Sequence, residues 1–351
     1  MAQGHLREAI ETYQQSLQLA SEHEAESQRI IAHHHLGLAL LHHEMRDDES
    51  AAQHFHKSME LGQQSALQDW SYRKYLAQAR LKESEGDLDS ALDLLDDAQH
   101  FYVRSLIPYT RPIEALKVSI YLKQGRLSNA QEWVREHGFS VNDDLSYLRE
   151  FEHITLARVL LAEYQVNRKE NSIHDALSLL KHLLKGAEDQ KRMGSMLEIL
   201  MVQALIYQTQ RDTSKALVSL ERALTLAQPE GYARIFVGEG NPMQALLMDF
   251  RAANEKQPRG NDRELTGYVD KLLSAFTQPK DIKQSKLIEP LSNRELEILR
   301  LIAQGLSNRE ISKRLFLALN TVKGHNQIIF DKLQVQRRTE AVARARELDL
   351  L

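Results

Sequence analysis

The stretch GDLDSALDLLDDA, residues 86–98, contains the pattern from which the fold of this chain can be predicted. A glycine, Gly86, is followed by an apolar residue two positions later and by an alanine five positions later. Apolar residues then recur at helical spacing, at Leu88, Ala91, Leu92, Leu95 and Ala98. Glycine allows a tight bend, and alanine lets a second helix approach closely. The stretch therefore predicts one half of a helical hairpin.

The same pattern recurs through the first two-thirds of the chain. Clear copies are GHLREA (4–9), GRLSNA (125–130) and NSIHDA (171–176), and looser copies are DDESAA (47–52) and RDTSKA (211–216). The aligned alanines are 43, 39, 39, 46 and 40 residues apart. A fixed period of this kind indicates stacked helical hairpins, and it exceeds the roughly 34 residues of ordinary tetratricopeptide repeats. We expect an all-α, tetratricopeptide-like right-handed superhelix with a concave inner face.

Composition and charge limit the class of protein. The 351 residues are 42% hydrophobic and 27% charged, with 7 Pro, 15 Gly and no Cys, as expected for a soluble helical chain outside the disulfide-bonded classes. A signal peptide and an apolar run long enough for a membrane helix are both missing from the sequence, so we expect a cytoplasmic protein without a membrane partner. No catalytic constellation is evident, and the chain is not expected to be an enzyme.

The charge is unevenly distributed along the chain. From Leu291 onward there are 11 Lys and Arg against 7 Asp and Glu, whereas the preceding residues hold 34 basic against 42 acidic side chains. A basic tail on an acidic body predicts that only the tail meets a polyanion.

Breaks in the pattern divide the chain into four parts. We expect a repeat domain at 1–227, an extension of it at 228–277, a linker at 278–290 (QPKDIKQSKLIEP, with prolines at both ends) and a tail domain at 291–351. The first copy of the motif would be the second helix of a hairpin whose first helix is missing. We therefore expect the chain to begin inside a longer protein.

Start signals place four helices in the tail. Ser292 with Glu295 and Ser307 with Glu310 form two capping boxes. The first helix presents Leu296, Leu299 and Ile302 on one face and ends at Gly305, and the second, from Asn308 to about Phe316, buries Ile311 and Leu315. Asn320 is expected to cap a third helix that runs to about Leu333, and a fourth spans about 339–348. A short helix pair followed by a basic helix is the arrangement that places a helix in the DNA major groove.

Two family resemblances follow from these motifs. LSNRELEILRLIAQGLSNREISKRLF, then NTVKGH and KLQVQRRTEAVARARELDLL, resembles the LuxR-type helix-turn-helix over residues 291–351. The long-period array with GYARIFVGEGNPM is similar to the C-terminal half of MalT-like regulators, the large ATP-binding members of that superfamily. The resemblance implies an ATPase ahead of the array, yet GxxxxGK[ST] is absent here, so we expect no cofactor in this chain and ATP only in a preceding region.

The resemblance implies which residues meet DNA. The family reads bases with the residues aligned to Lys323, Gly324 and Gln327, which lie at i, i+1 and i+4 on one outward helix face. Lys can donate to guanine and Gln can pair with adenine, while Gly324 either admits the backbone close to a base or is a tolerated weak point. The candidate phosphate contacts are cations and polar groups at helix starts: Ser307, Arg309, Lys313, Asn320, Thr321, Lys332, Arg337 and Arg338.

Asn326 departs from the apolar stripe formed by positions 322, 326, 329 and 333. A buried unpaired amide would cost about 1–3 kcal/mol. Either its amide pairs with a neighbouring backbone group, or the helix is rotated so that Ile328 and Ile329 carry the packing.

The array is expected to control the tail. By resemblance it binds a small-molecule inducer inside the superhelix, and the alternative is a module that docks a protein or peptide. Weak effector candidates are Trp70, Arg73, Tyr109 and Arg111, for which core packing or plain surface is the alternative. The sequence therefore predicts a transcription regulator, an activator, that binds double-stranded promoter DNA as a dimer or higher oligomer and contacts RNA polymerase.

Overall fold

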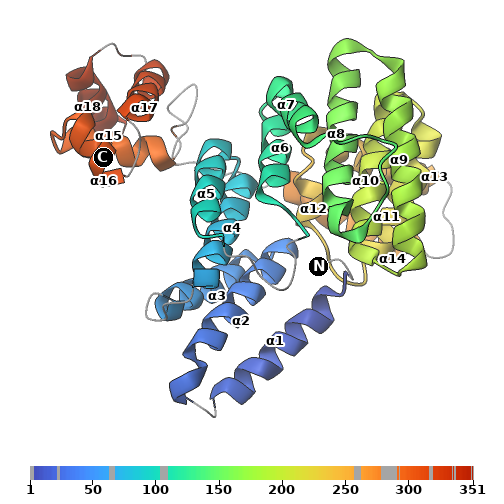
Figure 1. Cartoon of the computed structure of the whole chain (residues 1–351). Coiled ribbons are helices and arrows are strands. Elements are labelled where there is room, and N and C mark those ends of the chain that lie inside the picture. Colours follow the sequence, from blue (N-terminus) through green and yellow to red (C-terminus); the bar gives the residue numbers. More distant parts are fainter. Residues whose placement is uncertain are drawn as a thin grey trace. The chain divides into compact units, whose positions relative to one another are not determined.

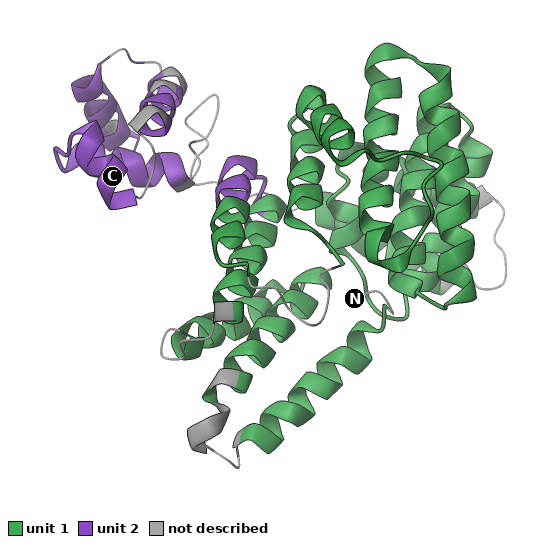
Figure 2. Ribbon diagram, viewed as in Figure 1, with its two compact units in different colours: residues 1–84, 94–278 green, residues 85–93, 279–351 purple. Residues whose placement is uncertain are grey.

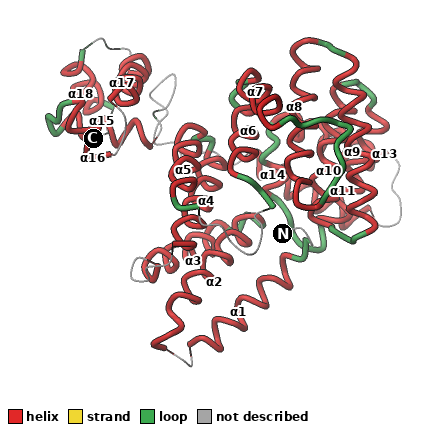
Figure 3. The backbone as a smooth tube through the Cα atoms, viewed as in Figure 1, coloured by secondary structure: helices red, strands yellow, loops and turns green. Residues whose placement is uncertain are grey.

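A computed structural model describes residues 4–21, 24–62, 68–102, 110–256, 262–277, 291, 293–315, 319–333, 335, 337–348 and 350. Among these residues there are helices and loops but no strand (Figure 3). The chain folds into two compact units (Figure 2). The larger unit contains residues 1–84 and 94–278, and the smaller unit contains residues 85–93 and 279–351. Each unit contains a separate hydrophobic core. The all-α fold expected from the repeat pattern is confirmed.

Helical hairpins build the larger unit (Figure 1). Its first eleven α-helices are α1 (Leu6–Ser21), α2 (Glu24–Glu44), α3 (Asp48–Gly62), α4 (Gln68–Glu85), α5 (Leu88–His100), α6 (Ile113–Lys123), α7 (Leu127–His137), α8 (Glu150–Asn167), α9 (Glu170–Asp189), α10 (Met193–Thr209) and α11 (Thr213–Ala227), and a 3-10 turn, η1 (Tyr147–Arg149), precedes α8. Helices α2 and α3, α6 and α7, α8 and α9, and α10 and α11 pack as pairs, and α8 and α10 join successive pairs. No described helix is long and apolar enough to span a membrane.

The hairpin turns explain the repeated motif. Gly86 and Gly125 have φ angles of 81° and 71°, in the left-handed region that glycine adopts without strain. The alanine five residues after each of them is completely buried. In the looser copy 47–52 the turn lies one residue earlier than the pattern predicts. Arg46 takes the left-handed conformation, and the alanine five residues after it, Ala51, is buried, whereas Ala52 is exposed.

The copy at 171–176 differs from the predicted pattern at its turn. Asn171 is not a turn residue but lies inside α9, which begins at Glu170, and the left-handed residue is Arg168, with φ of 53°. A non-glycine residue can occupy this region at a cost of about 1–2 kcal/mol. Because the left-handed residue is an arginine, the sequence does not mark the bend at Arg168 with a glycine or an asparagine. Ala176 is buried as expected.

Three further helices complete the larger unit: α12 (Arg234–Val237), α13 (Asn241–Lys256) and α14 (Asp262–Thr277). The segment 228–240, which we call the returning segment, runs back to the end of α2. There the amides of Ala233 and Ile235 donate to the backbone carbonyl (3.0 Å) and the side-chain carboxylate (2.9 Å) of Glu44. Further along, the carboxylate of Glu239 receives two hydrogen bonds from Arg158 of α8, at 2.9 and 2.6 Å. The returning segment thus connects helices far apart in the sequence.

Besides residues 85–93, which include the start of α5, the smaller unit contains four described helices: α15 (Asn293–Ala303), α16 (Asn308–Leu315), α17 (Leu319–Leu333) and α18 (Arg338–Glu347). The capping box at Ser307 is confirmed, because the Ser307 amide donates to Glu310 (2.7 Å) and the Glu310 amide donates to the Ser307 hydroxyl (3.4 Å). Ser292 lies outside the described residues. The expectation that Asn320 caps the third helix is wrong, because α17 already begins at Leu319.

Candidate nucleic-acid interface

Helix α17 has a buried face and an open face. Val322, Ile329 and Leu333 point into the core of the smaller unit. On the other side Thr321, Lys323 and Gly324 are exposed, and a Cβ added to Gly324 would meet no atom within 4 Å. The side chain of Gln327 lies outside the described residues. The predicted base-reading positions that can be described therefore share an unobstructed surface.

Part of the predicted phosphate-contact set is exposed in the same unit. Arg309 and Lys313 are exposed on α16, and Arg337 is exposed directly before α18. Ser307 is exposed as well, with its hydroxyl donating to Glu310 at 2.7 Å. The side chain of Asn320 lies outside the described residues. Exposed cations of a small domain can attract a phosphate backbone.

Lys332 is held inside the smaller unit instead. Its ammonium group donates to both carboxylate oxygens of Glu295, at 3.2 and 3.1 Å, and Glu295 is only 1% exposed. This ion pair joins α17 to α15. The sequence showed Glu295 only as part of a capping box, so nothing marked it as the partner of a distant lysine. We assign Lys332 to internal packing rather than to phosphate contact.

Arg338 is likewise engaged within the unit. Its guanidinium donates to Asn308 Oδ1 (3.3 Å) and to the carbonyl of Leu306, and burial lowers the pKa of Arg338 below its usual value. These bonds tie the start of α18 to the start of α16. We therefore assign Arg338 to internal packing as well.

Asn326 is paired, although not as the sequence suggested. The residue is 7% exposed, and its amide donates to the side-chain oxygen of Asn308 at 2.8 Å. Its own side-chain oxygen is buried without a partner among the described residues. The alternative in which Ile328 and Ile329 share the packing is wrong, because Ile329 is buried and Ile328 is 42% exposed.

Of the four weak effector candidates, the structure describes Trp70, Arg73 and Arg111, and each has a different environment. Trp70 is 4% exposed, and its indole N–H donates to Ser58 at 3.2 Å, so it packs between helices of the array. Arg73 is exposed and paired with Asp69 at 3.1 Å, and Tyr109 lies outside the described residues. Arg111 pairs with Glu198 and lies over the Phe151 ring, 4.6 Å from its centroid.

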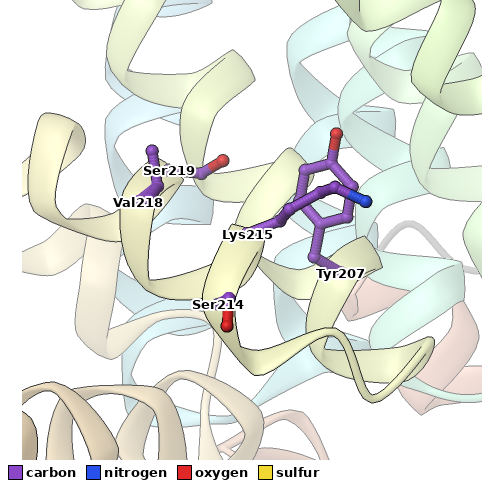
Figure 4. Close-up of a pocket in the computed structure, with 5 residues that line it drawn as sticks. All are labelled: Tyr207, Ser214, Lys215, Val218 and Ser219. Atoms are coloured by element: carbon purple, nitrogen blue, oxygen red, sulfur yellow. The ribbon is translucent and has the colours of Figure 1, made fainter.

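The hollows of the larger unit include two that are lined by described residues. One has a volume of about 40 Å³, enough for ordered water, and is lined by polar and aromatic side chains that include Thr110, Arg111, Tyr147, Phe151 and Glu198. The other, of about 260 Å³, lies on the hairpin of α10 and α11 (Figure 4). There Tyr207 stands beside Lys215, whose ammonium group is 5.6 Å from the ring centroid, and Ser214, Val218 and Ser219 complete the lining.

Comparisons with known proteins match both units. Residues 1–253 match the family described as MalT-like TPR region, and residues 289–345 match the family described as bacterial regulatory proteins, luxR family. The chain is 23% identical over 295 residues to the HTH-type transcriptional regulator MalT of Vibrio parahaemolyticus, with 78% of the chain and 31% of the relative covered. It is 26% identical over 286 residues to the protein of the same name from Klebsiella pneumoniae, with 76% and 30% covered.

The chain therefore spans about a third of the length of these curated relatives. The match to the first family covers most of the chain, and the second match covers the unit that carries the open face of α17. This chain belongs to the MalT-like TPR family, and it joins that helical array to a helix-turn-helix domain of the luxR family of bacterial regulatory proteins.

Proposed function

We propose that this chain is the signal-sensing and DNA-binding part of a transcription activator. The observation that carries the proposal is the open face of α17, where Lys323 and Gly324 are exposed in a domain of the luxR family and exposed cations of α16 lie in the same small domain. Helix α17 enters the major groove of promoter DNA, Lys323 donates to a guanine, and Arg309, Lys313 and Arg337 contact phosphates.

Binding of the full chain to DNA tests this proposal. A site is first selected from a library of random duplexes, and affinity is then measured by fluorescence anisotropy. We expect Lys323→Ala to weaken specific binding roughly 5- to 150-fold, as for the loss of a base contact. The control is Lys181→Ala, which removes an exposed lysine of α9. Unchanged affinity of Lys323→Ala for the selected site would show that the base-reading face is wrongly assigned.

We further propose that the larger unit binds a small-molecule inducer that controls the DNA-binding domain. The convergence of a guanidinium, a carboxylate and two aromatic rings at Arg111, Glu198, Tyr147 and Phe151 supports a polar ligand site in the array. The hollow is too small for a metabolite, so binding requires the array to open there. Docking of a peptide on the array is the alternative function.

A thermal-shift screen of the full chain against metabolites and peptides distinguishes the two functions. A saturable rise in melting temperature with a metabolite supports an inducer, and a rise only with peptides supports docking. Tyr147→Ala then locates the site, because it should abolish the metabolite shift. The matched control Tyr207→Ala alters the second hollow and should leave the shift intact.

The remaining partners follow from the same proposal. We expect ATP to be bound by a region outside these 351 residues, since the match covers only 31% of the curated relative and the sequence holds no GxxxxGK[ST] loop. The full chain is expected to bind DNA as a dimer or higher oligomer and to act through RNA polymerase. Analytical ultracentrifugation with and without the selected duplex measures the first of these expectations.

A further inference from the structure

Ile328 is an apolar side chain on the outer face of α17. It is 42% exposed and does not belong to the hydrophobic core of the smaller unit. Val322 and Ile329 supply the apolar packing of the helix, and Asn326 occupies the inner position between them. The fold of the domain therefore does not require an isoleucine at position 328.

The surroundings of Ile328 leave room for a ligand to approach. Residues four apart lie one above the other on a helix, so Ile328 stands one turn beyond Gly324 on the same side. Gly324 has no side chain, and even an added Cβ would meet no atom within 4 Å. The exposed Lys323 lies next to this gap. The outer face thus offers a cation, a gap and a branched apolar group in succession.

The chemistry of the major groove suggests what would meet such an apolar group. Of the four bases only thymine presents a methyl group there, and the other groove edges are hydrogen-bond donors and acceptors. If Ile328 covered a polar base edge, the donors and acceptors of that edge would lose their hydrogen bonds to water without gaining a partner, which costs free energy. Placing it against a methyl group removes apolar surface of both partners from water.

We propose that Ile328 is a specificity-determining residue that contacts a thymine methyl group in the major groove, beside the gap at Gly324. This inference rests on the proposed DNA-binding function, and it goes beyond the base contacts of Lys323 and Gln327. The favoured base pair at that position is A·T, recognised through the methyl group and not through a hydrogen bond.

Replacement of single thymines by deoxyuridine tests the inference, because it removes only the methyl group. The full chain and the selected duplex are used, with deoxyuridine placed at each thymine in turn. For the unaltered protein we expect one thymine at which the replacement weakens binding about four-fold, the equivalent of one buried methyl group. For Ile328→Ala that penalty should vanish, so that the thymine and deoxyuridine duplexes bind equally. Ile328→Val should retain most of the penalty.

The controls separate this inference from the proposed function. Val218→Ala removes another exposed apolar side chain, 67% exposed in the larger unit, and should preserve the penalty. A selected site whose deoxyuridine penalties are the same for the unaltered protein and for Ile328→Ala overturns the inference while DNA binding stands. Failure of the selection to enrich any sequence overturns both.

Discussion

At the scale of single residues, Lys332 and Lys313 show how burial decides what a cation does. Both are lysines of the DNA-binding domain, yet Lys332 is paired with the buried Glu295 and Lys313 is exposed. We expect Lys332→Ala to lower the free energy of unfolding of the smaller unit by about 3 kcal/mol, because it removes the ion-pair partner that α17 provides to a buried carboxylate. Lys313→Ala should change stability by less than about 0.5 kcal/mol.

DNA binding should show the opposite pattern for the same two variants. Lys313→Ala is expected to reduce the slope of log affinity against log salt by about one, the effect of losing one phosphate contact. Lys332→Ala, measured at a temperature where it stays folded, should leave the slope unchanged. A reduced salt slope for Lys332→Ala would show that Lys332 contacts a phosphate after all.

His43 predicts how stability depends on pH. Burial, with a further contribution from Arg234, lowers the pKa of His43 from 6.5 to about 4. The unfolded chain therefore binds more protons than the folded chain between these values, so the stabilising contribution is present above the unfolded pKa and is lost as pH falls. We expect a loss on the order of 2 kcal/mol near pH 5, measured by urea unfolding.

Two substitutions check the origin of this pH dependence. His43→Gln removes the titrating group and should flatten the decline in unfolding free energy between pH 7 and pH 5. The control is His182→Gln, at an exposed histidine of α9, which should leave the decline as it is. An equal decline in His43→Gln and in the unaltered protein would assign the pH dependence to other groups.

At the scale of helices and turns, two glycines provide a matched pair. Gly125 is in the left-handed region at the turn between α6 and α7, whereas Gly186 lies inside α9, and an added Cβ meets nothing within 4 Å at either position. Gly125→Ala should therefore destabilise the array by about 1 kcal/mol through backbone strain alone. Gly186→Ala should stabilise it by about 0.5–1 kcal/mol, the helix propensity gained. Urea unfolding followed by tryptophan fluorescence measures both, and a destabilised Gly186→Ala would contradict this account.

Helices and their pairing could be predicted because their signals are local. A turn residue and an alanine five positions later placed the hairpins, and the capping box of Ser307 placed α16. The signal failed at Arg46 and Arg168, which adopt the left-handed conformation without being glycine. Contacts between distant segments could not be predicted. Nothing in the sequence around Glu239 indicates that its carboxylate pairs with Arg158.

At the scale of the whole molecule, the described residues of the larger and the smaller unit form separate hydrophobic cores that share no residue. We expect thermal unfolding to show two transitions, because each core can be lost on its own. Ile311→Ala truncates a fully buried residue of the smaller core. It should reduce the free energy of unfolding of the smaller unit by about 2–5 kcal/mol and therefore lower the temperature of only one transition. Differential scanning calorimetry measures this, and a joint shift of both transitions would show that the units unfold together.

The exposure of the proposed DNA-reading face could be predicted from the sequence, whereas a site for an effector stays a prediction. A recognition helix is one continuous segment, so its exposed face follows from periodicity, as at Lys323 and Gly324. An effector site in a helical array is assembled from several helices, and the residues around Arg111 come from α8 and α10 as well. Trp70 is a candidate from the sequence because it lies on or beside a predicted first helix of a hairpin, but its neighbours in space make it part of the packing.

The vacant position at Gly324 has an evolutionary consequence. A Cβ added there would meet no atom within 4 Å, so the change to alanine carries no penalty from neighbouring atoms. Alanine or a longer residue would even raise the helix propensity of α17. A lineage that carries this domain can therefore acquire a new base contact in one mutational step and redirect the regulator to other genes before any compensating change is needed.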